Sequence, residues 1–168
     1  MREFGDDDNS AIAWKYPGFE REVIPAQCSR VVNPYEFGAI LDTWTGLNSG
    51  ITILELKWFT FEFTTIPNKS VRLMNLLEGP TNVDDNYGSR MHGWLVPPVT
   101  GEYLFWIASN GDGEFRLSNT DSKVNVASIC NSTSATPYPA RAWDKNPEQM
   151  SKNISLVAEQ AYYYEVRR

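Results

Sequence analysis

Hydrophobic and polar positions alternate along much of this chain with a period of two, the spacing expected of β-strands. Residues 102–108 are the clearest stretch, and apolar side chains there fill both alternating faces: Tyr103, Phe105 and Ile107 on one, Leu104, Trp106 and Ala108 on the other. A strand that is apolar on both faces belongs in the interior of a sandwich. We therefore predict that residues 102–108 form a central strand of the core.

Turn-forming residues separate this strand from its neighbours. Residues 91–96 end at Pro97-Pro98, and Thr100-Gly101 then leads into the central strand, which is a hairpin signal. Further strands are predicted, in chain order, at residues 51–56, 58–64, 74–77, 114–117, 124–129, 154–157 and 162–166. Together the strands favour an all-β fold, an antiparallel β-sandwich or barrel.

The first forty residues show less regular patterning. Asp6-Asp7-Asp8 indicates a solvated terminal tail more than a cation site. Prolines and a glycine interrupt the short apolar pieces of residues 14–34. We expect residues 1–40 to form an irregular arm that packs on a domain comprising residues 41–168.

Composition and charge narrow the classes of partner. The 168 residues are 42 % hydrophobic, which suits one domain with a large core. A net charge of −6, with no cluster of Lys or Arg, argues against nucleic acid and anionic membranes and leaves neutral sugars or cations. No apolar run approaches the ~20 residues that span a bilayer, and residues 1–10 lack the apolar segment of a secretory signal. The chain is therefore expected either to stay inside the cell or to be one segment of a longer protein.

The two cysteines leave two interpretations open. Cys28 and Cys130 are too far apart in sequence for a zinc site or a C-x-x-C redox motif. They form either one disulfide, which would close a loop of ~100 residues and contribute up to roughly 4.7 kcal/mol, or two free, buried thiols. Sequons at Asn68, Asn131 and Asn153 permit N-glycosylation in a eukaryotic secretory pathway.

No motif in the chain indicates catalysis. His92 is the only histidine, which excludes a histidine zinc cluster and a two-imidazole relay. No nucleophile-elbow motif surrounds a serine, and Gly111-Asp112-Gly113 precedes a strand pattern instead of the helix that follows a phosphate loop. We interpret His92 as a sheet-surface or satisfied core residue and predict a non-enzymatic protein.

The first candidate site is the polar loop that follows the central strand. Two glycines in residues 109–113 permit positive φ, and oxygen-bearing side chains crowd together there. Asn110 and Asp112 are therefore candidate carbohydrate contacts and candidate ligands of a metal ion.

A second polar segment, residues 119–138, is rich in Ser, Thr and Asn, and long polar loops in compact domains are often functional. Tyr138, Arg141 and Trp143 stand at its end. Aromatic and guanidinium groups suit sugar faces and hydroxyls, although they suit core edges equally well. We take these three residues as further candidate carbohydrate contacts.

Residues 80–109 carry three motifs in a fixed order: the turn D-N-Y-G-S-R, the hairpin P-P-V-T-G and the strand F-W-I-A-S. In this order they resemble the protective-antigen-fourteen (PA-14) domain family. Matching segments at residues 43–47, 67–70, 141–149 and 161–163 extend the resemblance to about three quarters of the chain. It implies a β-sandwich used mostly as a carbohydrate-binding module in adhesins, glycosidases, toxins and other extracellular proteins.

The resemblance also implies a calcium site, from which this chain departs. Sugar-binding members place two consecutive aspartates directly after the A-S of the strand, and the calcium that these chelate ligates sugar hydroxyls. Here the two positions are Asn110 and Gly111. Calcium takes about six to eight oxygen ligands, several of them carboxylates, so Asn110 and Asp112 should bind it weakly, at ~10⁻⁴–10⁻³ M, or not at all. We interpret Asp84-Asp85 as part of the turn motif.

The family pattern continues past its Y-Y-x-E strand into one more strand. We expect either that the N-terminal arm fills this edge or that an open edge invites a partner. Two functional hypotheses result. The first is an extracellular or cell-surface carbohydrate-binding module for adhesion, which uses residues 110–113 and 131–143. The second is a structural or protein-interaction domain of a larger extracellular assembly that has lost the calcium-dependent sugar site.

Overall fold

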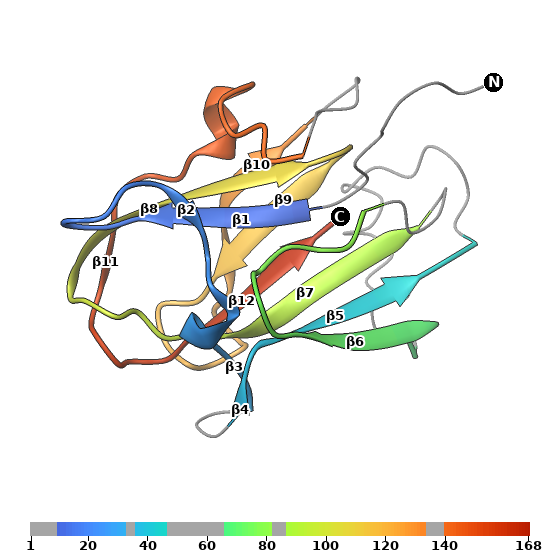
Figure 1. The fold of residues 1–168 in the computed structure, drawn as a ribbon, viewed down its shortest axis with the longest axis horizontal. Coiled ribbons are helices and arrows are strands. Elements are labelled where there is room, and N and C mark those ends of the chain that lie inside the picture. The colour runs from blue at the N-terminus through green and yellow to red at the C-terminus, as the bar shows by residue number, and fades with distance from the viewer. Residues whose placement is uncertain (1–9, 33–35, 47–65, 82–86, 134–139) are drawn as a thin grey trace.

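The structure is a computed structural model, and it describes residues 10–32, 36–46, 66–81, 87–133 and 140–168. These ranges contain twelve strands and two short 3₁₀ helices (Figure 1). In chain order they are β1 (Ser10–Lys15), β2 (Glu22–Val23), η1 (Ala26–Cys28), β3 (Ser29–Val32), β4 (Glu36–Phe37), β5 (Ala39–Trp44), β6 (Lys69–Leu73), β7 (Gly88–Leu95), β8 (Gly101–Ser109), β9 (Gly113–Leu117), β10 (Ala127–Ser132), η2 (Pro147–Gln149), β11 (Ile154–Leu156) and β12 (Tyr162–Arg167). The described part of the chain holds no helix with the length and apolar character needed to cross a membrane.

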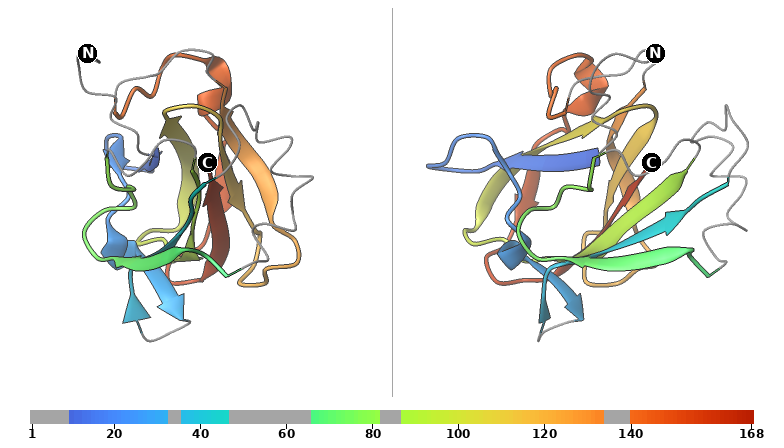
Figure 2. Two further views of the ribbon diagram at one scale, coloured as in Figure 1. Left: turned by 90° about the vertical axis from the view of Figure 1, so that its right-hand side faces the viewer. Right: turned by 45° about the vertical axis from the view of Figure 1, so that its right-hand side comes forward.

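The described strands form two antiparallel sheets. The small sheet has the order β11-β8-β1-β2, and the large sheet runs β10-β9-β12-β7-β3-β4, with β5 also paired to β7 and β6 to β5. β3 and β5 share one edge of β7, because β3 pairs with residues 94–95 and β5 with residues 88–92. The turned views show β1 and β2 in a layer apart from β5, β6 and β12 (Figure 2). The predicted all-β fold with antiparallel sheets is confirmed.

The hydrophobic core lies between these layers. On β8, the side chains of Tyr103, Phe105 and Ile107 are fully buried in the core cluster, as the alternating pattern predicts. The opposite face of β8 is partly covered as well: Trp106 is buried, and the guanidinium of Arg21 lies 5.1 Å from its ring centroid. β8 is thus a central strand whose core face is fully buried, and whose opposite face is buried at Trp106 and Ala108 and partly open at Leu104.

The N-terminal segment corrects one expectation. β1 pairs with β8 along its whole length, from Ser10 opposite Ser109 to Lys15 opposite Leu104, while β3 joins the large sheet through β7. Pro17 and Pro25 lie between these strands, where a missing N–H costs no ladder hydrogen bond. The prediction of an irregular arm is therefore wrong for residues 10–32, although a boundary near residue 40 stays a prediction.

Other strand predictions agree in place and differ at their ends. β7, β8, β9, β11 and β12 each cover a predicted segment. β10 begins three residues after the predicted start, and its pairing with β9 shifts register between Ser128 and Cys130, a β-bulge that simple alternation does not reveal. Near the segment predicted at 74–77, the strand is β6, and Leu76 contributes only an isolated bridge. The strands predicted at 51–56 and 58–64, together with Asp6–Asp8 and Asp84-Asp85, lie outside the described residues.

The two cysteines are free thiols. Cys130 is buried in the core cluster and Cys28 packs half-buried against the same cluster. Burial raises the pKa of both thiols, and nearby Glu22 raises that of Cys28 further. Of the two interpretations, the structure has the two unbridged thiols.

Candidate functional site

The loop between β8 and β9 is shaped by two glycines. Gly111 has φ +92°, a region that side chains other than glycine rarely adopt. At Gly113 a Cβ atom would lie 2.7 Å from the Cβ of Ser109, which is too close for any side chain without a shift of the loop. These two positions explain why the chain turns sharply here, and they keep Asn110 and Asp112 in one tight loop.

Three backbone carbonyls of this segment accept hydrogen bonds from distant parts of the chain. The hydroxyl of Ser132, at the end of β10, lies 3.4 Å from the carbonyl oxygens of both Ser109 and Gly111. Arg168 donates from Nε to the carbonyl of Asn110 at 2.8 Å. The loop is therefore held by residues from β10 and from the segment after β12.

Arg168 also connects the loop to β7. Its backbone exchanges hydrogen bonds with Ser89, at 2.8 and 2.9 Å, which continues the pairing of β12 with β7. Its guanidinium stacks on the ring of Tyr87, with 4.4 Å between the guanidinium carbon and the ring centroid, and donates to the tyrosine hydroxyl. Arg168 and Tyr87 are thus site residues that the sequence interpretation missed. The D-N-Y-G motif was the available signal, but the pairing of β12 with β7 was needed to place Arg168 beside it.

The donor set of the loop is poor for a cation. Asn110 and Asp112 are both half-buried and together supply one carboxylate and one amide oxygen. The guanidinium of Arg168, which is charged at any physiological pH, donates to the carbonyl of Asn110 in this loop. A nearby positive charge and a single carboxylate both weaken calcium binding. Among the described residues, no group of three or more His, Cys, Asp or Glu side chains could hold a metal ion.

The other three predicted contacts are placed differently. Tyr138 lies outside the described residues. Arg141 has φ +59° and makes a bidentate ion pair with Glu78, at 3.0 and 2.7 Å, while Trp143 is half-buried. The guanidinium of Arg141 thus joins two surface segments through its ion pair with Glu78. This is a structural role, the alternative to sugar contact that its residue type also allowed.

The Arg141 ion pair lies at the same end of the small sheet as the loop. Glu78 forms a bridge with Ala11 of β1, and the next residue, Gly79, donates to the carbonyl of Ser10 at 2.8 Å. Ser10 in turn stands opposite Ser109, where the loop begins. Buried Gln149 anchors the segment that carries Arg141, because its amide donates to the carbonyls of Ile107 and Ala142 at 2.9 and 2.7 Å.

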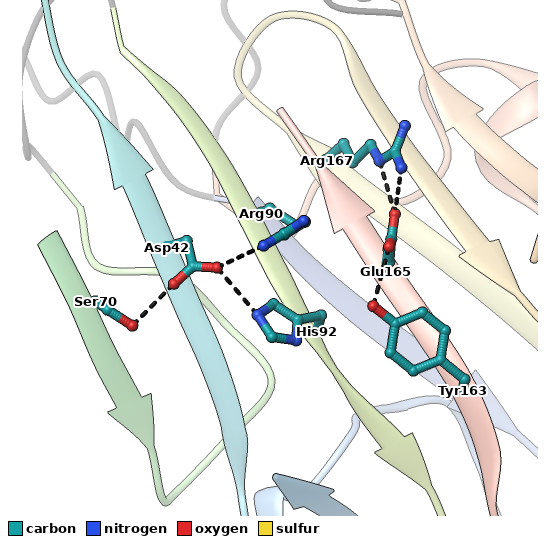
Figure 3. A network of polar contacts seen from close by, with 7 residues as sticks. All are labelled: Asp42, Ser70, Arg90, His92, Tyr163, Glu165 and Arg167. Carbon is teal, nitrogen blue, oxygen red and sulfur yellow. Dashed lines mark hydrogen bonds and ion pairs between the residues drawn. The ribbon is translucent and has the colours of Figure 1, made fainter. Parts of the chain in front are cut away.

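A separate polar network crosses the large sheet (Figure 3). Buried Asp42 on β5 accepts hydrogen bonds from Ser70 of β6 at 2.8 Å and from Arg90 of β7 at 2.9 Å. Nε2 of His92 lies 3.0 Å from the same carboxylate. Burial alone would raise the pKa of Asp42, but the hydrogen bonds from Arg90 and Ser70 outweigh it and hold that pKa below its usual value.

On the neighbouring strand, Glu165 accepts hydrogen bonds from the hydroxyl of Tyr163 at 2.9 Å and from Nε of Arg167 at 2.8 Å. These three side chains are two residues apart and so share one face of β12. Burial opposes ionisation of Glu165, yet the charge of Arg167 keeps its pKa lowered. The large sheet therefore carries two carboxylates that are ionised and paired at neutral pH.

The Asp42 network does not have the arrangement of a Ser-His-Asp triad. In a Ser-His-Asp triad the imidazole lies between the hydroxyl and the carboxylate. Here Asp42 lies between Ser70 and His92, so the imidazole does not contact the hydroxyl that it would have to deprotonate. Burial, reinforced by the charge of Arg90, lowers the pKa of His92 and favours its neutral form. The arrangement agrees with His92 as a satisfied, partly buried histidine.

Comparison with known protein families identifies the family of this chain. A family model described as PA14 domain matches residues 50–167, which is most of the chain. The chain belongs to the PA14 domain family. Its members are carbohydrate-binding and adhesin-type modules that also occur in glycosidases, and no sign of catalysis accompanies the match in this chain. No solved structure matches the chain.

Proposed function

We propose that this PA14 domain is a non-enzymatic carbohydrate-binding module whose site is the loop between β8 and β9. The observation that carries the proposal is the fixed geometry of this loop, in which Ser132 and Arg168 hold the backbone while Asn110 and Asp112 supply polar side chains. Preorganised polar groups bind with less entropic cost than mobile ones. The aromatic ring of Tyr87 lies beside them under Arg168.

We further propose that sugar is bound by direct hydrogen bonds, with calcium weak or absent. Asp112 offers carboxylate acceptors, Asn110 offers an amide, and Arg168 offers guanidinium donors. These groups match the donor and acceptor character of sugar hydroxyls without a bridging ion. The expected setting is extracellular or at a cell surface, as part of a larger protein.

The first test is a glycan array probed with the full chain, once with calcium and once with a chelator. We expect the same glycans to bind in both conditions. Asp112→Asn should weaken binding at least about tenfold, since a hydrogen bond to a charged group contributes roughly 1.5–3 kcal/mol. Asp121→Asn is the matched control, because Asp121 is exposed and lies between β9 and β10. If the folded protein bound no glycan on the array, the proposal would be wrong.

Calcium binding is tested by calorimetry on the same protein. One carboxylate and a neighbouring guanidinium predict a dissociation constant no tighter than ~10⁻⁴ M. A sub-micromolar constant that Asp112→Ala abolishes would contradict this and would favour a calcium-dependent sugar site of the family type. Calorimetry therefore distinguishes direct hydrogen bonding of the sugar from calcium-mediated binding, even though both models predict binding of the same glycan.

The competing proposal is a structural or protein-interaction domain of a larger extracellular assembly. It is favoured by Asn110 and Gly111, which stand where sugar-binding members carry two aspartates. On this proposal the glycan array stays empty and a partner copurifies with the full chain. A stable monomer without partners counts against it.

A further inference from the structure

Four aromatic rings stack in series from the core to the surface. The centroid distance is 6.0 Å from Phe105 to Tyr103, 5.1 Å from Tyr103 to Tyr16 and 4.5 Å from Tyr16 to Phe19, with interplanar angles of 19°, 23° and 29°. The first three rings are buried, whereas Phe19 is 51 % exposed. The series therefore ends at the surface with a ring that is backed on one side by Tyr16 and reachable by solvent.

A tight turn holds this last ring in place. The N–H of Phe19 donates to the carbonyl of Tyr16 at 3.0 Å, and between them stand Pro17 and Gly18, the latter with φ +86°. Proline followed by glycine at positive φ is the pattern of a type II turn. Pro17 packs on Gly101, where a Cβ atom would lie 2.9 Å from the proline Cγ. The turn is thus fastened to the start of β8, and Phe19 is preorganised.

Phe19 borders a groove of about 440 Å³, a size within the usual range of small-molecule sites. Pro17 and Leu104 add further apolar side chains to its lining. The polar lining residues are Lys15, Glu20, Glu102 and Asn153. Lys15 lies 3.6 Å from the carboxylate of Glu20, and Glu102 accepts a hydrogen bond from Ser155. Two carboxylates and one ammonium make the groove net negative.

We propose that this groove is a second carbohydrate site, which takes a neutral, β-linked pyranose. A pyranose whose substituents are equatorial has a flat face of C–H groups, and this face packs against an apolar ring such as Phe19. Hydroxyls at the rim of the sugar then bond to the carboxylates and to the amide of Asn153. The excess of carboxylate disfavours an acidic sugar.

The groove is independent of the loop site. It lies at the start of β8, at Glu102 and Leu104, while the loop follows the end of the same strand at Ser109. At about 3.3 Å per residue the two places are roughly 20 Å apart. Two sites at that separation would let the domain bind two units of one glycan chain at the same time. Such bivalent binding makes the overall affinity higher than that of either site alone.

The test is chemical-shift mapping of the labelled full chain with cellobiose as the probe. Bacterial expression keeps Asn153 unmodified. With cellobiose at about 10 mM, we expect chemical-shift changes at the backbone amides of Gly18, Phe19 and Leu104. This concentration suits a dissociation constant in the millimolar range, which we expect for a site that holds one sugar unit. N-acetylneuraminic acid should shift none of them.

Four variants make the result decisive. Phe19→Ala should weaken cellobiose binding at least tenfold, and Phe19→Trp should retain it. Phe37→Ala is the matched control, since Phe37 on β4 is 43 % exposed and does not line the groove. Asp112→Asn should leave the groove shifts unchanged, so that failure of the loop site and failure of the groove are distinguished. No groove shifts with cellobiose, an equal loss in Phe37→Ala, or shifts confined to residues 110–113 would each overturn the proposal.

Discussion

At the scale of single residues, Asp42 makes the sharpest stability prediction. Its carboxylate is buried and bonded to Ser70, Arg90 and His92. Asp42→Asn removes the charge that these partners share and takes from Arg90 the carboxylate to which it donates. We expect a loss of about 1–3 kcal/mol in the free energy of unfolding at pH 7. Urea denaturation measures it.

The pH dependence of this loss follows from the lowered pKa of Asp42. A carboxyl whose folded pKa lies below its unfolded value, about 3.9, stabilises the folded state above that value and loses this contribution as the pH falls through the folded pKa. The difference between the wild type and Asp42→Asn should thus still be present at pH 5, and it should shrink as the pH falls below about 4. Exposed Asp121→Asn should change stability by no more than about 0.5 kcal/mol. A pH-independent difference would show that the charge of Asp42 contributes nothing.

The candidate site shows how far single residues could be predicted. That Asn110 and Asp112 share one tight loop could be predicted because turn chemistry is local: two glycines and their polar neighbours are adjacent in sequence. Arg168 could not be found this way, since it lies 58 residues from Asn110 in the sequence and only the pairing of β12 with its neighbours brings the two together. Arg141 was interpreted from its residue type alone, whereas its contacts are set by Glu78, 63 residues away. Long-range partners decide which guanidinium belongs to the loop.

At the scale of elements, strands with a long apolar or alternating pattern could be predicted from the sequence, whereas short strands could not. β8 carries a continuous apolar run from Tyr103 to Ala108; its core face is buried as expected, while its opposite face is buried at Trp106 and Ala108 but only partly at Leu104. β1 is a short strand of six residues, three of them with small side chains, and one residue separates its end from Pro17 and Gly18, so local pattern predicts a loop there. Its burial comes from pairing with β8, and such tertiary context overrides weak local propensity. The type II turn after β1 explains the same Pro-Gly pair that had indicated irregular structure.

At the scale of the whole molecule, the path of the N-terminal segment predicts that the fold cannot do without it. β1 lies beside β8 in the small sheet and β3 beside β7 in the large one, so residues 10–32 connect both layers (Figure 1). Ile12, Trp14 and Ile24 are fully buried. Burial of such side chains contributes about 1.5–3 kcal/mol each, or roughly 5–9 kcal/mol for three. This is as large as the total stability of many domains, about 5–15 kcal/mol.

A fragment of residues 41–168 should therefore fail to unfold cooperatively, although it contains the whole segment that matches the PA14 family. Removing β1 would expose one edge of β8 and the core side of Phe105 and Tyr103, which pack against Trp14 and its neighbours. Thermal and urea unfolding of the fragment and the full chain, followed by near-ultraviolet circular dichroism, test this directly. If the fragment unfolded cooperatively within about 1 kcal/mol of the full chain, the buried contacts of β1 would contribute little, and the boundary near residue 40 would mark a domain that stands alone.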